Sequence, residues 1–264
     1  HIGPLARTVE DAALMLDVMA GDHPADPFSL PTPTQSYTDA IQESVDDLSI
    51  AYSPDLGVYP VADSVRTLVG DAVDAFDTAG ATVERADPEF GLTNEAILDA
   101  YYTFATVLWE GLLDGLSEDG LDPRGDNRDQ LTDSTVETIL NADSVSTQAL
   151  TAAQRVRTKV LEGMTELFDE YDLLVCPTLG VSPFEIGELP TEVAGESIEP
   201  RRGWLLTQPF NMTGQPVGTL PAGLTDDGLP VGFQLVGPRL AEVTVLAASA
   251  AYERVQPWQD RYPA

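Results

Sequence analysis

The sequence has very few of the side chains that most often carry catalysis. Cys176 is the single cysteine, so no disulfide can form within the chain, as is usual in a reducing cytoplasm. His1 is terminal, and His23 lies in the polar loop GDHPAD, where we expect it to face solvent. The shortage of histidine and cysteine and the absence of a GxSxG motif argue against a Ser-His-Asp triad and against a zinc site.

Positive charge is also scarce. The chain has 44 Asp and Glu against 13 Lys and Arg, a net charge of −31, and Lys159 is its only lysine. A surface of this kind repels phosphate backbones, so we expect no direct binding of nucleic acid. Because salt screens the self-repulsion of such a surface, we predict a salt-loving source. Stability that fell as potassium chloride rose from low to molar concentration would contradict this.

Long apolar runs are missing as well. No run approaches the roughly 20 residues needed to cross a bilayer, and the first residues, HIGPLART, have no features of a secretory leader. The hydrophobic content of 43% is nevertheless sufficient for a substantial core. We therefore expect a soluble, cytoplasmic globular protein that does not bind membranes.

The periodicity of the apolar residues along the chain predicts an α/β fold. A strand at Leu48–Ser53, a helix at Ala62–Ala79 and a strand at Thr82–Arg85 form a β-α-β unit, which indicates a parallel pair of strands. Capping residues and apolar faces predict further helices at Thr8–Ala20, Thr93–Leu116, Thr147–Glu170 and Ala241–Arg254. A short apolar run predicts a further strand at Leu173–Cys176.

The stretch Trp204–Gly237 carries the densest pattern. It predicts a bent loop, PFNMTGQP, then two strands at Val217–Leu220 and Val231–Val236 that are joined by a turn at Thr225–Gly228. From the pattern alone, a core hairpin beside a shaped loop explains all of it.

Two other segments each allow a structural and a functional interpretation. The stripe of the helix at 93–116 is more typical of core than of a cofactor box; it consists of Ile97, Tyr101, Phe104, Leu108 and Leu112. The acidic segment 117–133 is more typical of a solvated surface than of a metal site, so we expect no metal.

A basic cluster and a strand end supply candidate site residues. The cluster consists of three basic residues within five positions, Arg155, Arg157 and Lys159. Either these side chains form ion pairs along the helix with residues such as Glu162, or one of the arginines binds a substrate carboxylate or carbonyl. Thr178 follows a strand, and ligands gather at the carboxyl ends of strands in α/β folds, so we expect it on the rim of a site. Cys176, in an apolar run, is expected to be a buried small side chain rather than a nucleophile.

Three separated blocks resemble the amidase signature family. GPLARTVEDAALMLDVMAG resembles the segment after that family's serine-rich catalytic core, YDLLVCPT its strand ending in Pro-Thr, and PFNMTGQPVGTLPAGLTDDGLPVGFQLVG its C-terminal loop and hairpin. The order and spacing agree from Gly3 to Pro263. The resemblance implies a mixed β-sheet flanked by helices, with residues 1–264 as the C-terminal part of a single amidase domain.

The resemblance also implies hydrolysis of a carboxamide through a serine acyl-enzyme, without a cofactor. In that family the chemistry is carried by a nucleophilic serine, a second serine and a lysine, in motifs that do not occur in these 264 residues. We therefore expect no catalytic residue in this chain, which begins with His1 rather than Met and, we expect, partway through a longer protein. Lys159 does not match the motif of the catalytic lysine and is expected on a helix surface.

Within the family, general amidases are favoured over the A subunit of the tRNA-dependent glutamine amidotransferase. AAQRVRTKV resembles a helix of that amidotransferase and places Arg157 where it binds the carboxylate of glutamine. However, Trp204 stands where the amidotransferase has the aspartate that holds the glutamine ammonium, which favours an aromatic or aliphatic amide. Phe210 and Asn211, in PFNMTG, complete the expected wall of the acyl pocket, and Gln234 is expected to bind nearby backbone.

The expected ligand is thus a small-molecule amide, bound by Arg157, Thr178, Trp204, Phe210 and Asn211. A homodimer is left open. A function of another class also remains: a catalytically silent fragment that acts in binding or as a scaffold.

Overall fold

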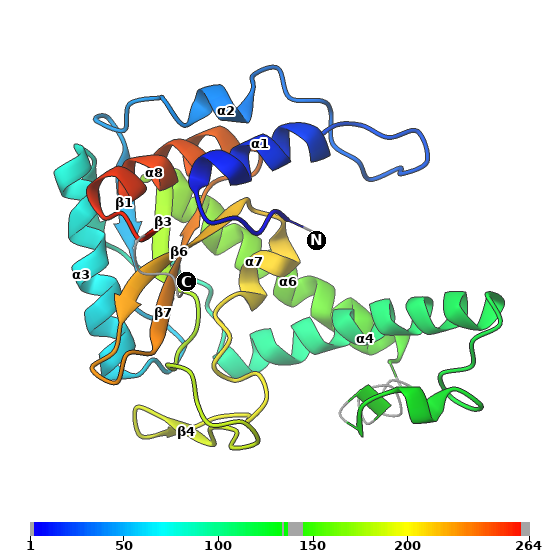
Figure 1. The fold of residues 1–264 in the computed structure, drawn as a ribbon. Helices are drawn as coiled ribbons and strands as arrows, with labels where there is room; N and C mark the ends of the chain where they lie inside the picture. Colours follow the sequence, from blue (N-terminus) through cyan, green and yellow to red (C-terminus); the bar gives the residue numbers. More distant parts are fainter. Residues whose placement is uncertain (1–2, 134, 137–144, 260–264) are drawn as a thin grey trace.

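The computed structural model describes residues 3–133, 135, 136 and 145–259, so the predictions for His1 and for the end of the domain around Pro263 lie outside it. Its centre is a mixed five-stranded sheet flanked by helices, as the sequence predicts (Figure 1). The strands of this sheet are β1 (Ser49–Tyr52), β2 (Thr82–Arg85), β3 (Leu173–Pro177), β6 (Val217–Leu224) and β7 (Pro230–Val236). A separate small hairpin consists of β4 (Glu192–Val193) and β5 (Glu196–Ser197).

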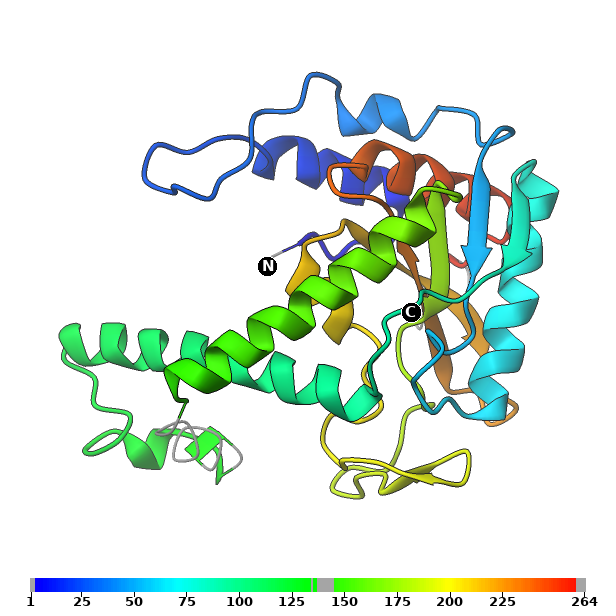
Figure 2. The same ribbon diagram turned by 180° about the vertical axis from the view of Figure 1, so that it is seen from behind.

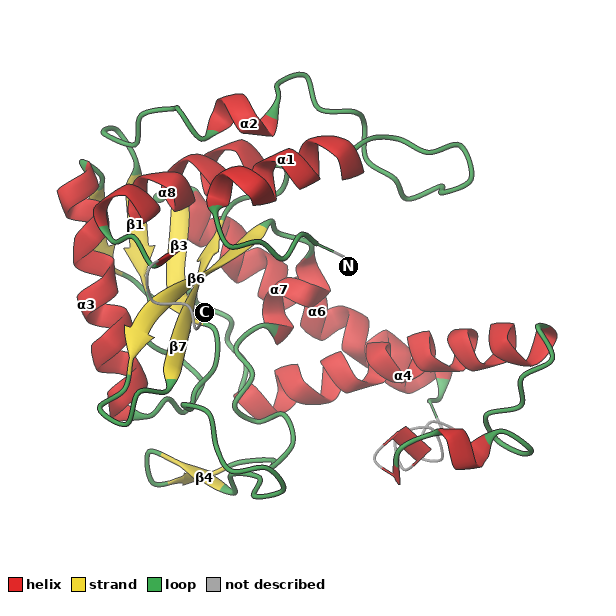
Figure 3. Cartoon of the chain, in the orientation of Figure 1, coloured by secondary structure: helices red, strands yellow, loops and turns green. Residues whose placement is uncertain are grey.

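Helices alternate with the strands in the first part of the chain (Figure 3). They are α1 (Val9–Met19), α2 (Tyr37–Ala40), α3 (Asp63–Ala79), α4 (Asn94–Glu118), the 3₁₀ turn η1 (Arg128–Gln130), α6 (Thr147–Phe168), α7 (Gln208–Thr213) and α8 (Glu242–Val255). The five long helices agree with the predicted ones to within about two residues at each end, the usual scatter of such boundaries.

The sheet order is β2-β1-β3-β7-β6. β1 is parallel to both β2 and β3, which confirms the parallel pair that the β-α-β pattern predicts. β7 is antiparallel to β3 and to β6, which confirms the predicted hairpin. The hairpin turn is closed by the N–H of Thr225, which donates to the carbonyl of Leu229 at 2.8 Å.

Two helical layers cover the sheet. α3 and α8 pack against each other and against β6 and β7, while α4, α6 and α7 pack together. α8 lies on the near side of the sheet in Figure 1, and α6 crosses the opposite face in Figure 2. Between sheet and α8, the rings of Phe76, Phe233 and Tyr252 contact one another with centroids 4.9 to 6.0 Å apart.

Local signals set the helix ends. Thr8 Oγ1 accepts the N–H of Asp11 at 3.1 Å and so caps α1, as predicted. Gly80 ends α3 with φ of 107°, a conformation that is strained for residues with a side chain.

Part of the predicted core is wrong. Ile97 at the start of α4 is buried, but Leu108 is 75% exposed and Leu112 is 51% exposed. Figure 1 shows the reason: the second half of α4 projects from the body of the molecule, which leaves Leu108 and Leu112 exposed there.

The predicted bent loop PFNMTGQP is also wrong in part. Residues Gln208–Thr213 form the helix α7, with Pro209 in its first turn and Gly214, at φ of 77°, at its C-terminal end. The proline and glycine thus begin and end a short helix, since proline fits a first helical turn and glycine the left-handed position after the last.

Among the described helices, none is long and apolar enough to cross a bilayer.

Candidate functional site

Three segments of the chain meet at the carboxyl end of β3. The N–H of Thr178 donates to the carbonyl of Gly232 at 3.1 Å, and the carbonyl of Thr178 accepts the N–H of Leu206 at 3.3 Å. The N–H of Gly180 donates to the carbonyl of Trp204 at 2.8 Å. The sheet order also reverses direction beside this point, because the chain passes from β1 outward to β2 and returns to β3 on the other side. Ligands of α/β sheets bind at such positions.

The side chain of Gln234 links these segments by hydrogen bonds. Its side chain is buried on β7, and its Nε2 donates to the carbonyls of Pro177 at 3.1 Å and Leu206 at 3.3 Å. The prediction that Gln234 bonds nearby backbone is therefore confirmed. A buried amide bonded in this way fixes the spacing between the two segments that leave the sheet.

Thr178 and Trp204 are the two predicted site residues that this arrangement brings together. Both are half-buried. Thr178 Oγ1 is itself buried and has no hydrogen-bond partner among the described residues. A buried hydroxyl without a partner costs free energy, which a ligand with a polar atom at this position would recover.

The other predicted residues lie elsewhere. Phe210 is buried in the core on α7, and Asn211, beside it, is exposed. Arg157 is exposed on α6, with its guanidinium 5.3 Å from the centroid of the Phe104 ring on α4. Arg157 thus stacks on an aromatic ring, and the ion pairs found within the described part of the chain do not include it.

Lys159 and Cys176 have the surroundings expected from the sequence. Lys159 is exposed on α6. Cys176 is completely buried on β3, and this burial raises the pKa of its thiol, against a smaller lowering by the hydrogen bond from Gln234. A thiol with a raised pKa is not the thiolate that a nucleophilic cysteine needs.

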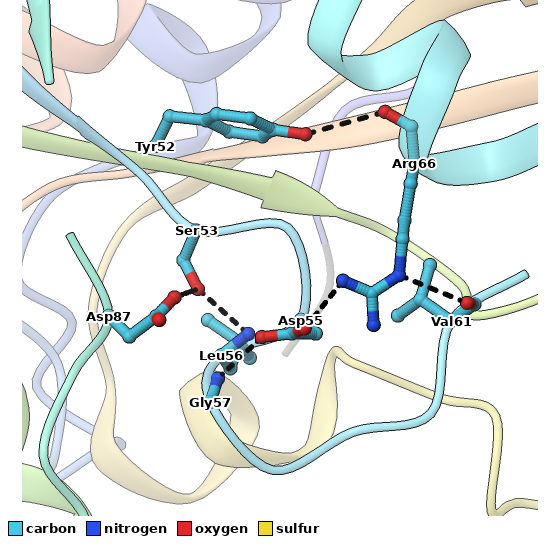
Figure 4. A network of polar contacts seen from close by, with 8 residues as sticks. All are labelled: Tyr52, Ser53, Asp55, Leu56, Gly57, Val61, Arg66 and Asp87. Carbon is cyan, nitrogen blue, oxygen red and sulfur yellow. Dashed lines mark hydrogen bonds and ion pairs between the residues drawn. The ribbon is translucent and has the colours of Figure 1, made fainter. Parts of the chain in front are cut away.

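A polar network supports the site from the carboxyl end of β1 (Figure 4). Ser53 Oγ donates to Asp87 Oδ1 at 2.5 Å and accepts the N–H of Leu56 at 2.8 Å. Arg66 pairs with Asp55 at 2.6 Å. This network is not predictable from the sequence, because Ser53 and Asp87 are 34 positions apart and neither belongs to a motif.

The turn that this network fixes continues into close contact with the candidate site. The carbonyl of Gly180 accepts the N–H of Ala62 at 2.8 Å. A Cβ at Gly180 would lie 2.5 Å from the carbonyl oxygen of Pro60, so only glycine fits there. The Ser53 network therefore holds one wall of the site in place.

An open hollow of about 700 Å³ lies beside the same network. It is lined by Gly57, Val58, residues 87–93 and Ala96, and by none of the five predicted binding residues. We place the candidate site at the end of β3 rather than in this hollow, since the segments converge there around the orphaned buried hydroxyl of Thr178.

Phe184 is a further residue near the candidate site that no sequence motif marks. Its ring packs edge-on against Trp204, with the centroids 5.3 Å apart and an angle of 77°. The only local signal is a proline-flanked aromatic residue in the loop after β3.

Comparison with known proteins identifies the family of the chain. The family model described as amidase matches residues 1–246. The chain belongs to the amidase signature family. The acylamidase of Rhodococcus erythropolis is 35% identical over 264 residues, which are 99% of this chain and 54% of that protein. The A subunit of the glutamyl-tRNA(Gln) amidotransferase of Thermosynechococcus vestitus is 30% identical over 281 residues, which cover all of this chain and 57% of that protein.

Solved structures similar to this chain have the same fold. A bacterial aryl acylamidase of the amidase signature family superposes with a TM-score of 0.90 at 35% identity, over 98% of this chain and 53% of that one. A 6-aminohexanoate cyclic dimer hydrolase complexed with substrate superposes with a TM-score of 0.82 at 28% identity, over 98% and 55%. The chain thus spans about half the length of the curated relatives that it matches.

Proposed function

We propose that this chain forms the substrate-binding part of an amidase, which hydrolyses a carboxylic acid amide to a carboxylate and ammonia or an amine. Family membership supports the reaction class. The observation that carries the binding role is the convergence of Thr178 and Trp204 at the end of β3, where a buried hydroxyl faces no partner among the described residues.

The proposed chemistry is a relay without histidine. A neutral lysine takes a proton through a bridging serine as the nucleophilic serine attacks the amide carbon, and backbone N–H groups stabilise the oxyanion. The amine leaves with a proton, and water then hydrolyses the acyl-serine. The motifs of these three residues do not occur in the 264 residues, so we assign this chain binding and scaffold roles and place the relay outside it.

The test is amide hydrolysis by the protein at the length of its relatives and by the 264-residue chain alone. We expect the longer protein to hydrolyse acetanilide or hexanamide and to lose this activity after treatment with a fluorophosphonate. We expect the 264-residue chain alone to be inactive. Serine-dependent turnover by the chain alone would overturn the proposed division of roles.

A Thr178→Val variant tests the binding role. If the Thr178 hydroxyl bonds the substrate, kcat/KM falls roughly threefold to tenfold, the range for one hydrogen bond. Its stability is not reduced, because valine removes a buried hydroxyl that has no partner among the described residues. The matched control is Thr82→Val, at an exposed position of β2, an edge strand that does not pair with β3. Unchanged kcat/KM in Thr178→Val would remove this residue from the site.

A role as the A subunit of a glutamine amidotransferase is the second candidate, because a protein of that name is 30% identical to this chain. We favour the general amidase, since Trp204 offers an apolar ring in place of a carboxylate for the glutamine ammonium. Release of ammonia from glutamine, dependent on a partner protein, would reverse this preference.

A further inference from the structure

The segment Glu199–Leu205, here called the Trp204 turn, has a closely fixed backbone. Glu199 Oε2 accepts the N–H groups of Arg201 at 3.0 Å and Arg202 at 2.8 Å. The N–H of Gly203 donates to the carbonyl of Glu199 at 2.9 Å. A Cβ at Gly203 would lie 2.8 Å from the backbone of Glu199, so the turn closes only with glycine at this position.

Neighbouring elements hold the same turn. Asn94, at the start of α4, donates from Nδ2 to the carbonyl of Gly203 at 3.3 Å, and Gln208 donates from Nε2 to the carbonyl of Arg202 at 3.1 Å. The guanidinium of Arg202 lies 3.8 Å from the centroid of the Tyr102 ring. Contacts from α4 and α7 therefore add to those within the turn.

The indole of Trp204 is oriented by this frame. Its Nε1 donates to the carbonyl of Pro200 at 3.0 Å, so the single polar group of the ring is occupied. Its backbone carbonyl accepts the N–H of Gly180, in the segment that leaves β3. The ring therefore offers apolar surface in a fixed orientation at the candidate site.

Phe184 completes a pair with this ring. It comes from the segment that leaves β3, packs edge-to-face on Trp204, and remains 40% exposed. Ile186, two residues further on, is fully exposed. The two aromatic rings thus leave apolar surface open on the segments that meet at the end of β3. A third ring can pack there in the same edge-to-face or offset geometry.

We propose that Phe184 and Trp204 bind the aromatic ring of the substrate, so that the site selects neutral aryl amides over alkyl amides. This inference rests on the proposed function. A fixed aromatic pair loses little side-chain freedom when a ring binds, which favours affinity. A net charge of −31 disfavours an anionic substrate but has no such effect on a neutral ring.

Binding of two ketones without an amide bond tests the pair in the protein at the length of its relatives. Acetophenone carries a phenyl ring, and hexan-2-one carries an alkyl chain. For Phe184→Leu and Trp204→Leu, we expect the Kd of acetophenone to rise roughly tenfold and that of hexan-2-one to change by less than about twofold. The control is Trp109→Leu, at a 39% exposed tryptophan on the projecting half of α4, which is expected to change neither Kd.

Phe184→Leu is the decisive variant, since its exposed ring can be replaced without loss of fold. Wild-type affinity for acetophenone in this variant, or an equal loss for both ketones, would overturn the inference. Kinetics separate it from the proposed function. If the variants lose acetophenone binding but the wild-type protein cleaves no amide, the ring site is supported and the proposed hydrolase function is overturned. If kcat/KM for acetanilide is unchanged in Phe184→Leu, the hydrolase stands and the ring site does not.

Discussion

The helices α3 and α4 have similar apolar stripes and different fates. The stripe of α3 is buried along its length, from Val65 to Phe76, between the sheet and α8. The stripe of α4 is buried at Ile97 and exposed at Leu108 and Leu112. A helical period therefore shows which face of a helix is apolar, whereas burial depends on whether another element reaches that face.

The largest expected effect is the loss of a ring from the covered helix. Phe76 contacts both Phe233 and Tyr252 and is completely buried, so Phe76→Ala should lower the free energy of unfolding by about 3 to 5 kcal/mol. Leu108→Ala, on the exposed stripe of α4, should change it by less than about 0.5 kcal/mol. Urea denaturation measures both, and similar losses would show that α4 is covered in solution.

Substituting alanine for a glycine should have a smaller effect on stability, with opposite signs in α6 and α4. A Cβ at Gly163 in α6 would lie 2.8 Å from the carbonyl oxygen of Glu89, so Gly163→Ala should destabilise the fold by about 1 to 3 kcal/mol. Gly115 in α4 has open space around its Cβ position, so Gly115→Ala should stabilise by about 0.5 to 1 kcal/mol through helix propensity. Thermal melting of the two variants should give shifts in opposite directions, and shifts of the same sign would contradict the difference in packing.

The smallest expected effect is the loss of stability at low pH, which should differ between carboxylates in α1 and α4. Burial raises the pKa of Asp17, but hydrogen bonds from Ser36, Tyr37 and Thr38 outweigh this and lower it from 3.8 to about 2. The stabilisation is present above the unfolded pKa and is lost as the pH falls towards about 2.

The urea midpoint of Asp17→Asn should accordingly lie below that of the wild type at pH 5 and approach it as the pH falls to 2. The control is Asp114→Asn in α4. Asp114 is largely exposed and lies 3.7 Å from Arg124, a surface pair that contributes little. A gap for Asp17→Asn that stayed constant over this pH range would contradict the role of the carboxylate.

The parts of the fold that sequence predicts are those with local causes. The β-α-β unit and the hairpin follow from period, turn residues and caps, which act within a few positions. The helix α7 was missed because proline and glycine mark a loop and the ends of a short helix in the same way. The exposed half of α4 was missed because its surroundings are set by distant elements.

The same distinction applies to the site. Thr178 is predictable, because a residue after a buried strand lies at a sheet edge wherever the rest of the chain goes. Trp204 required the family resemblance, and its partner Phe184 lies 20 positions earlier without a motif of its own. The Ser53–Asp87 pair is equally silent in sequence, because its partners meet only through the order of the strands.

The buried amide of Gln234 has a consequence for how this scaffold can diversify. It holds Pro177 and Leu206, the two ends of an excursion that contains the Trp204 turn and the β4-β5 hairpin. With its ends anchored from within the sheet, the excursion can change in length and sequence without moving the strands beneath it. One glutamine on a core strand thus separates the strands, which stay in place, from a connecting segment whose length and sequence are free to change.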